Sequence, residues 1–132
     1  MTPISDPIAR ERLEAAAVAV ASRHDRMDGA YALVWEPILV AVAIEALKLI
    51  LAECRKERPE ALRRRAATIK SSPWYAIPAR LEYTRLWRQV DRAFASQGVT
   101  YTRTDVDGML GRILDGAAEA DDLTIGACQR AV

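Results

Sequence analysis

The sequence predicts an all-α protein: a compact, single-domain bundle of five to six helices over residues 1–132, with an apolar helix over residues 37–57 at its centre. Two observations lead to this expectation. Apolar residues gather on one side of five segments when side chains are spaced at about 100° per residue, as in an α-helix. The length of 132 residues and the hydrophobic fraction of 51% also suit one domain with one core.

The first helix is expected to begin after Ser5 or Asp6, because either side chain can cap the helix N-terminus. Pro7 would stand in the opening turn, where its missing N–H costs nothing. The turn-forming residues Met27-Asp28-Gly29 are expected to end the helix.

The second helix is expected over residues 37–57, with Pro37 in its first turn. Arg58-Pro59 would interrupt it, because a residue before proline resists the α conformation. Apolar side chains cover an unusually wide arc of this helix. Such a helix belongs in the middle of a bundle or at a subunit interface.

A short third helix is expected over residues 59–70, where Leu62, Ala66 and Ile69 share one face. Residues 71–78 follow and contain two prolines. This segment is expected to be an ordered connector whose aromatic side chains pack on the core.

The fourth helix, expected over residues 78–97, shows the clearest periodicity in the chain, and Gly98 is expected to stop it. Its apolar face is formed by Tyr83, Leu86, Trp87, Val90 and Phe94. Residues 99–103 are rich in β-forming residues, but no second strand is expected to pair with them. They are interpreted as an extended linker.

A fifth helix is expected to begin at Thr104, whose hydroxyl would accept a hydrogen bond from the amide of Asp107. The tail from Asp121 is expected to form a last, weak helix.

The charges nearly cancel over the whole chain, with 19 Lys+Arg against 18 Asp+Glu. Their distribution is uneven. Residues 55–92 carry 11 basic against 4 acidic residues, whereas residues 1–54 carry 5 against 8 and residues 93–132 carry 3 against 6. Positive charge is therefore confined to the middle third.

Three arginines of this basic third, Arg85, Arg88 and Arg92, are spaced so that they lie on one side of the fourth helix, opposite its apolar face. The consecutive Arg63, Arg64 and Arg65 instead fan around the third helix, so they cannot all address one surface. Guanidinium groups bind phosphate and carboxylate oxygens in bidentate fashion.

The favoured function is a non-catalytic binding module whose basic middle third engages nucleic acid or an acidic protein, with Arg85, Arg88 and Arg92 in contact and Arg63 to Arg65 assisting. The simpler alternative is that these arginines only solvate an exposed face. No recognised nucleic-acid-binding motif accompanies them.

Two further functions stay open. The wide apolar arc of residues 37–57 suits a homo-oligomer, such as a homodimer, that buries this helix between subunits. Alternatively, Trp74, Tyr75 and Trp35 suit a small-molecule binder with an aromatic-lined pocket.

Catalysis, cofactors and metals are not expected, because the chain has no glycine-rich phosphate loop, zinc-ligand spacing or G-x-S-x-G turn. Cys54 and Cys128 are expected to be reduced thiols, with Cys54 buried and inert. His24 is interpreted as a boundary residue near a helix end. The acidic N-terminal segment argues against export, and charges interrupt the longest apolar stretch, so we expect a cytoplasmic protein without membrane association.

Overall fold

The computed structural model describes residues 6–22 and 29–132, and the side chains of residues 6–21 and 37–132. Over the described residues the protein consists of helices and contains no strand, which confirms the predicted all-α bundle. The helices are α1 (Pro7–Ser22), α2 (Gly29–Glu53), α3 (Pro59–Ser71), α4 (Ile77–Ser96), α5 (Arg103–Glu119) and α6 (Asp122–Arg130).

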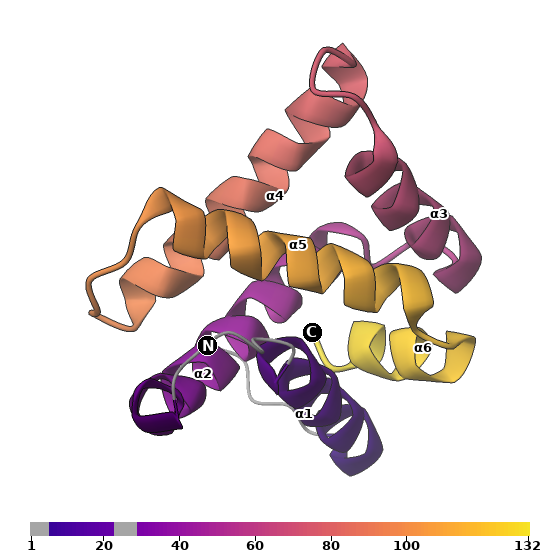
Figure 1. Ribbon diagram of the computed structural model, residues 1–132. Coiled ribbons are helices and arrows are strands. Elements are labelled where there is room, and N and C mark those ends of the chain that lie inside the picture. Colours follow the sequence, from indigo (N-terminus) through magenta and orange to yellow (C-terminus); the bar gives the residue numbers. More distant parts are fainter. Residues whose placement is uncertain (1–5, 23–28) are drawn as a thin grey trace.

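Two helices share the centre of the bundle. α2 packs mainly on α1 and α4, whereas α5 crosses the molecule and contacts α1, α2, α3 and α4 (Figure 1). α3 and α4 diverge from a common tip at the top of the view, and α6 returns to pack on α1. The central position that the sequence predicts for the apolar helix is thus shared with α5.

The main core is contiguous and receives buried residues from all six helices. Its largest fully buried side chains are Phe94, Leu13, Met109, Leu110, Ile113, Val42, Val90 and Val106. A smaller cluster of Cys54, Leu62 and Ile125 joins the end of α2 to α3 and α6. In the part of the chain that the structure describes, no helix is both long enough and apolar enough to cross a bilayer.

The start of α1 is as predicted, with Pro7 as its first residue. The Asp6 carboxylate accepts a hydrogen bond from the Ile8 amide at 3.0 Å and so satisfies a free N–H of the first turn. The first helix was predicted to end at Met27-Asp28-Gly29. This was wrong for Gly29, because Gly29 is the first residue of α2. Residues 23–28, including His24, lie outside the described ranges.

The predicted bounds of the second helix were wrong at both ends, since α2 covers Gly29–Glu53 instead of residues 37–57. Pro37 lies inside the helix, where it removes one backbone hydrogen bond without ending it. At the other end, the Gln129 side-chain amide donates to the carbonyls of Cys54 and Glu57, both at 3.0 Å. This side chain of α6 thus supplies a hydrogen bond to backbone carbonyls in the turn that follows α2.

The face predicted for α3 is confirmed, because Leu62, Ala66 and Ile69 are all buried. α4 also ends close to the predicted residue. Gly98 follows its last turn with a φ of 64°, a left-handed conformation that a glycine adopts without steric cost.

The predicted N-cap of the fifth helix was wrong by two residues. α5 begins at Arg103, and Thr102 and Asp105 form a reciprocal capping box with distances of 2.8 Å (Thr102 N to Asp105 Oδ2) and 3.3 Å (Asp105 N to Thr102 Oγ1). The carboxylate of Asp107 instead accepts hydrogen bonds from α4. The weak helix predicted for the tail is α6, capped by Asp121.

The expectation that the aromatic residues of the connector pack on the core was also wrong. Trp74 and Tyr75 are 79% and 68% exposed. They are the central residues of a turn closed by a hydrogen bond from the Ala76 amide to the Pro73 carbonyl at 2.9 Å. The tight turn directs both side chains outward, and their rings contact each other edge to face with centroids 6.0 Å apart.

Candidate functional site

The outer face of α4 brings together the arginine stripe that the sequence predicts. Arg85, Arg88 and Arg92 are all exposed. Within the described part of the chain, Arg88 and Arg92 have no carboxylate at salt-bridge distance, and Arg85 reaches only Glu82, at 3.9 Å. Their guanidinium groups are therefore available to an external anion.

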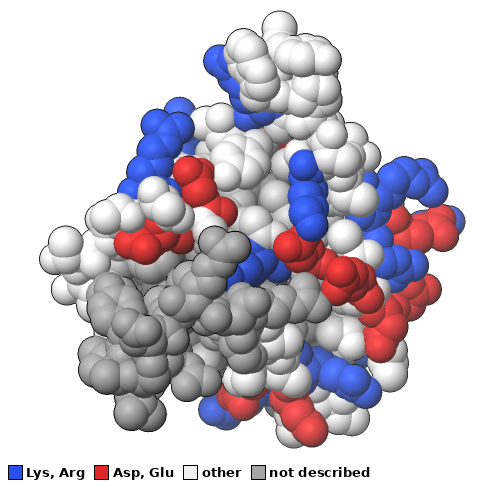
Figure 2. Space-filling model, viewed as in Figure 1, with Lys and Arg blue, Asp and Glu red and all other residues white. Residues whose placement is uncertain are grey.

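An exposed apolar surface extends this stripe toward the N-terminus of α4. Ile77 and Leu81 are 67% and 66% exposed, and the turn with Trp74 and Tyr75 precedes them directly. We call Trp74, Tyr75, Ile77 and Leu81 the apolar tip. The top of the molecule, where α3 passes into α4, is largely uncharged, and basic side chains lie below it along the edge over α4 (Figure 2).

Two of the three arginines of α3 are engaged inside the protein. Arg63 pairs with Asp122 and donates to the carbonyl of Ala120 at 3.3 Å. Arg65 donates to Glu57 Oε1 at 2.5 Å and also pairs with Glu82.

Only the middle residue of this trio, Arg64, is exposed. The expected fan around α3 is thus observed. Arg63 and Arg65 are only partly exposed, and their ion pairs join α3 to neighbouring parts of the chain.

The inner face of α4 is fixed by a carboxylate of α5. Asp107 Oδ1 accepts hydrogen bonds from Tyr83 Oη at 2.8 Å and from Trp87 Nε1 at 2.9 Å. Burial and the bond to Asp107 raise the pKa of Tyr83 to about 12. On the next turn, Gln89 Nε2 donates to Glu53 Oε1 of α2 at 2.6 Å. These bonds set the rotation of α4 about its axis, and hence the direction in which the arginine stripe points.

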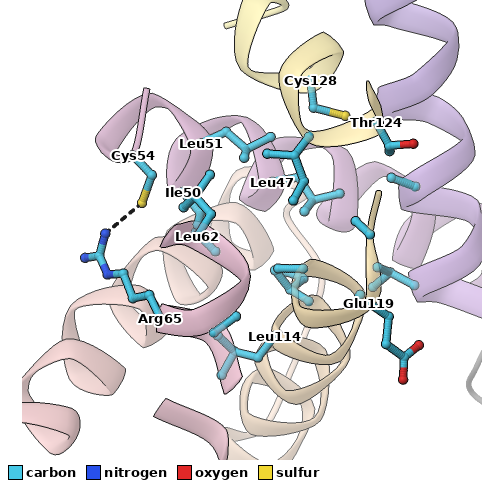
Figure 3. Close-up of a pocket in the computed structure, with 18 of the residues that line it drawn as sticks. Leu47, Ile50, Leu51, Cys54, Leu62, Arg65, Leu114, Glu119, Thr124 and Cys128 are labelled. Carbon is cyan, nitrogen blue, oxygen red and sulfur yellow. Dashed lines mark hydrogen bonds between the residues drawn. The ribbon is translucent and has the colours of Figure 1, made fainter. Parts of the chain in front are cut away.

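A second candidate site is an aliphatic, partly open cavity of about 320 Å³ lined by residues of α1, α2, α3, α4, α5 and α6. Leu47, Ile50, Leu62 and Leu114 point into it from three of these helices (Figure 3). None of the aromatic residues with described side chains lines it, so Trp74 and Tyr75 do not form the pocket that the sequence suggested. The side chain of Trp35 lies outside the described residues.

Both cysteines line the cavity as free, buried thiols, and the burial of Cys54 confirms the prediction made from the sequence. Burial raises the pKa of Cys128 to about 11. Burial also raises the pKa of Cys54, although the Arg65 guanidinium, whose Nη1 lies 2.9 Å from the Cys54 sulfur, acts in the opposite direction. Both side chains therefore stay protonated and poorly nucleophilic at neutral pH.

Sequence reasoning missed this cavity. Its signal in the sequence is the small side chains that line it from α1 and α5, namely Ala16, Ala19, Gly116 and Ala117. Small residues on facing helices also permit close packing, so their spacing does not reveal whether space is left between the helices.

Comparison with known proteins found no matching family model, no similar curated protein and no similar solved structure. Among the described residues, no group of three or more histidine, cysteine or acidic side chains is placed to hold a metal ion. The functional interpretation therefore depends on the outer face of α4 and on the cavity.

Proposed function

We propose that this protein is a non-catalytic binding module that holds single-stranded nucleic acid on the outer face of α4. The observation that carries the proposal is the exposure of Arg85, Arg88 and Arg92 on one side of one helix, with Arg88 and Arg92 unpaired within the described chain. An extended strand can place its phosphates along such a stripe.

The apolar tip favours a single strand over a duplex. Trp74 and Tyr75 are exposed beside the stripe, and unpaired bases stack on such rings whatever their sequence. Bases in a duplex are already stacked on each other and present only their edges. We therefore expect binding that tolerates sequence changes and weakens as salt is added.

The proposal is tested with a fluorescently labelled oligothymidylate of roughly 15 nucleotides, whose anisotropy is measured at several salt concentrations. Replacement of Arg85, Arg88 and Arg92 by glutamine should weaken binding at least tenfold. If the stripe contacts three phosphates, the slope of log K against log salt should fall by about 2.

A matched control removes the same charge elsewhere. Arg55, Arg58 and Arg130 are exposed and lie outside α4, so their replacement by glutamine changes the net charge equally. This control should retain most of the affinity. Equal losses in both triple variants would mean that only net charge matters and would remove the stripe as a site.

The acidic-protein alternative is an outcome of the same experiment. The partner would be an acidic protein if the oligonucleotide does not bind and an acidic peptide does. Binding of that peptide should then depend on Arg85, Arg88 and Arg92.

The homo-oligomer alternative is tested separately by light scattering at high concentration. A molar mass equal to that of one chain would exclude it. Leu39, Val42, Ala43, Ala46, Leu47 and Ile50 of the apolar arc are buried within the bundle itself, so this arc does not require a second subunit.

A further inference from the structure

We infer that the aliphatic cavity, lined by all six helices, is a binding site for a small, neutral, predominantly hydrocarbon molecule. The inference is independent of the nucleic-acid proposal, since Trp74, Tyr75 and the arginine stripe do not line the cavity. It rests on the cavity's size, the chemistry of its lining and the access to it.

The size of the cavity selects a small molecule. The cavity is partly open to solvent, and its volume of about 320 Å³ is many times that of a water molecule. An apolar cavity of about 150 Å³ accepts benzene, so this one accommodates roughly twelve non-hydrogen atoms. A partner helix, with a diameter of about 10 Å, is too wide to enter it.

The lining selects a neutral molecule. Its one cationic group, Arg65, is already engaged by Glu57 and Glu82. Thr124 already donates hydrogen bonds to the carboxylate of Asp121, which caps α6.

The remaining polar groups offer no better site for a charge. The carboxylate of Glu119 points away from the cavity and is also engaged (Figure 3). The thiols of Cys54 and Cys128 stay neutral because burial raises the pKa of both. A charged ligand would lose its hydration without gaining a partner, whereas a hydrocarbon loses nothing by leaving water.

Access to the cavity is provided between α1 and the end of α5. Ala19 and Glu119 are the lining residues that are exposed, so they mark the opening. The short side chains of Ala16 and Ala117 stand next to them, whereas Gly116 packs against Val20, whose Cγ2 lies 3.5 Å from where a Cβ at this glycine would stand.

The experiment titrates the full chain with 1-nonanol, which has about ten non-hydrogen atoms and fits the expected size. Isothermal titration calorimetry should give saturable 1:1 binding. The melting temperature should rise by roughly 5 °C at tenfold excess over the dissociation constant, because the ligand binds only the folded state. Nonanoate, which has the same chain and a carboxylate, should bind at least tenfold more weakly.

Filling the cavity should abolish binding. Ala117→Leu adds a branched side chain to the cavity from α5, and Ala16→Leu adds one from α1. If one of these variants does not fold, the other still tests the inference. Ala67→Leu is the matched control, because Ala67 is exposed on α3 and does not line the cavity. A cavity variant should lose at least tenfold in affinity for nonanol while Ala67→Leu binds as the natural protein does.

The thiols supply a second readout in the same protein. Occupancy should slow the alkylation of Cys54 and Cys128 severalfold, because both residues line the space that nonanol fills. Absence of saturable nonanol binding up to its solubility would overturn the inference. So would equal affinity in the folded cavity variants, or nonanoate binding as tightly as nonanol. None of these outcomes bears on the arginine stripe, which is tested with oligonucleotide.

Discussion

The two faces of α4 differ in how their polar groups are satisfied. On the inner face, Glu82 pairs with Arg65 of α3, Tyr83 and Trp87 donate to Asp107 of α5, and Gln89 donates to Glu53 of α2. On the outer face, Arg88 and Arg92 have no charged partner in the described chain. The same helix is thus fastened to three neighbours on one side and open to solvent on the other.

This difference separates residues that hold the fold from residues that are free to bind. Arginine occurs on both sides of the division, since Arg65 bridges to the inner face while Arg88 projects from the outer one. Arginine content alone therefore says little about function. The presence or absence of a carboxylate within reach decides what each arginine does, and the comparison can be tested by substitutions on either side.

The largest effect on stability is expected for Asp107→Ala. This change leaves the Tyr83 hydroxyl and the Trp87 indole N–H without their acceptor, and hydrogen bonds to a charged group contribute about 1.5–3 kcal/mol each. Because both donors are only partly buried, we expect a loss of about 3 kcal/mol in the free energy of unfolding, measured by urea denaturation. Asp107→Asn, which keeps an acceptor oxygen, should lose less. A loss below 1 kcal/mol for Asp107→Ala would contradict the role given to the inner face.

Arg65→Ala is expected to follow, with a loss of about 2 kcal/mol, because it strands the half-buried carboxylates of Glu57 and Glu82 without their cation. Its neighbour Arg64 is exposed, and Arg64→Ala should change stability by less than about 0.5 kcal/mol. Urea denaturation of both variants compares the two directly. Equal losses would show that the ion pairs of Arg65 contribute nothing particular to the fold.

A smaller effect should appear at high pH through Tyr83. Because its pKa is raised from 10.0 to about 12 in the folded protein, the phenol favours folding fully below pH 10, and this contribution disappears as pH rises through 12. Cys128 adds a similar loss between its ordinary value of 9.0 and about 11. The stability difference between the natural protein and Tyr83→Phe should therefore shrink from pH 9 to pH 12. A constant difference would exclude the Tyr83–Asp107 bond as its source.

The smallest effect is expected on the outer face. Arg88→Ala and Arg92→Ala remove exposed side chains without ion-pair partners in the described chain, so each should leave the free energy of unfolding within about 0.5 kcal/mol of the natural value. The urea midpoint measures this. A loss comparable with that of Arg65→Ala would remove the distinction between the two faces and with it the argument that the stripe is kept for binding.

Much of the fold was predictable from periodicity and capping. Leu62, Ala66 and Ile69 are buried as their spacing indicates, and the cap at Asp6 and the stop at Gly98 are confirmed. The errors occurred where two local signals competed. Pro37 is read as a helix start but lies within α2, and Thr102 caps α5 although Thr104 offers the same motif two residues later.

The helical faces and the arginine stripe can be read from the sequence alone, because both depend on spacing along one helix. Which arginines are paired depends on how the helices pack, since Glu82 is 17 residues from Arg65 in the chain and Asp122 is 59 residues from Arg63. The cavity also depends on packing, because a partly open space lined by six helices arises only from how their side chains meet. Local patterning sets the faces of each helix, and packing decides what those faces enclose.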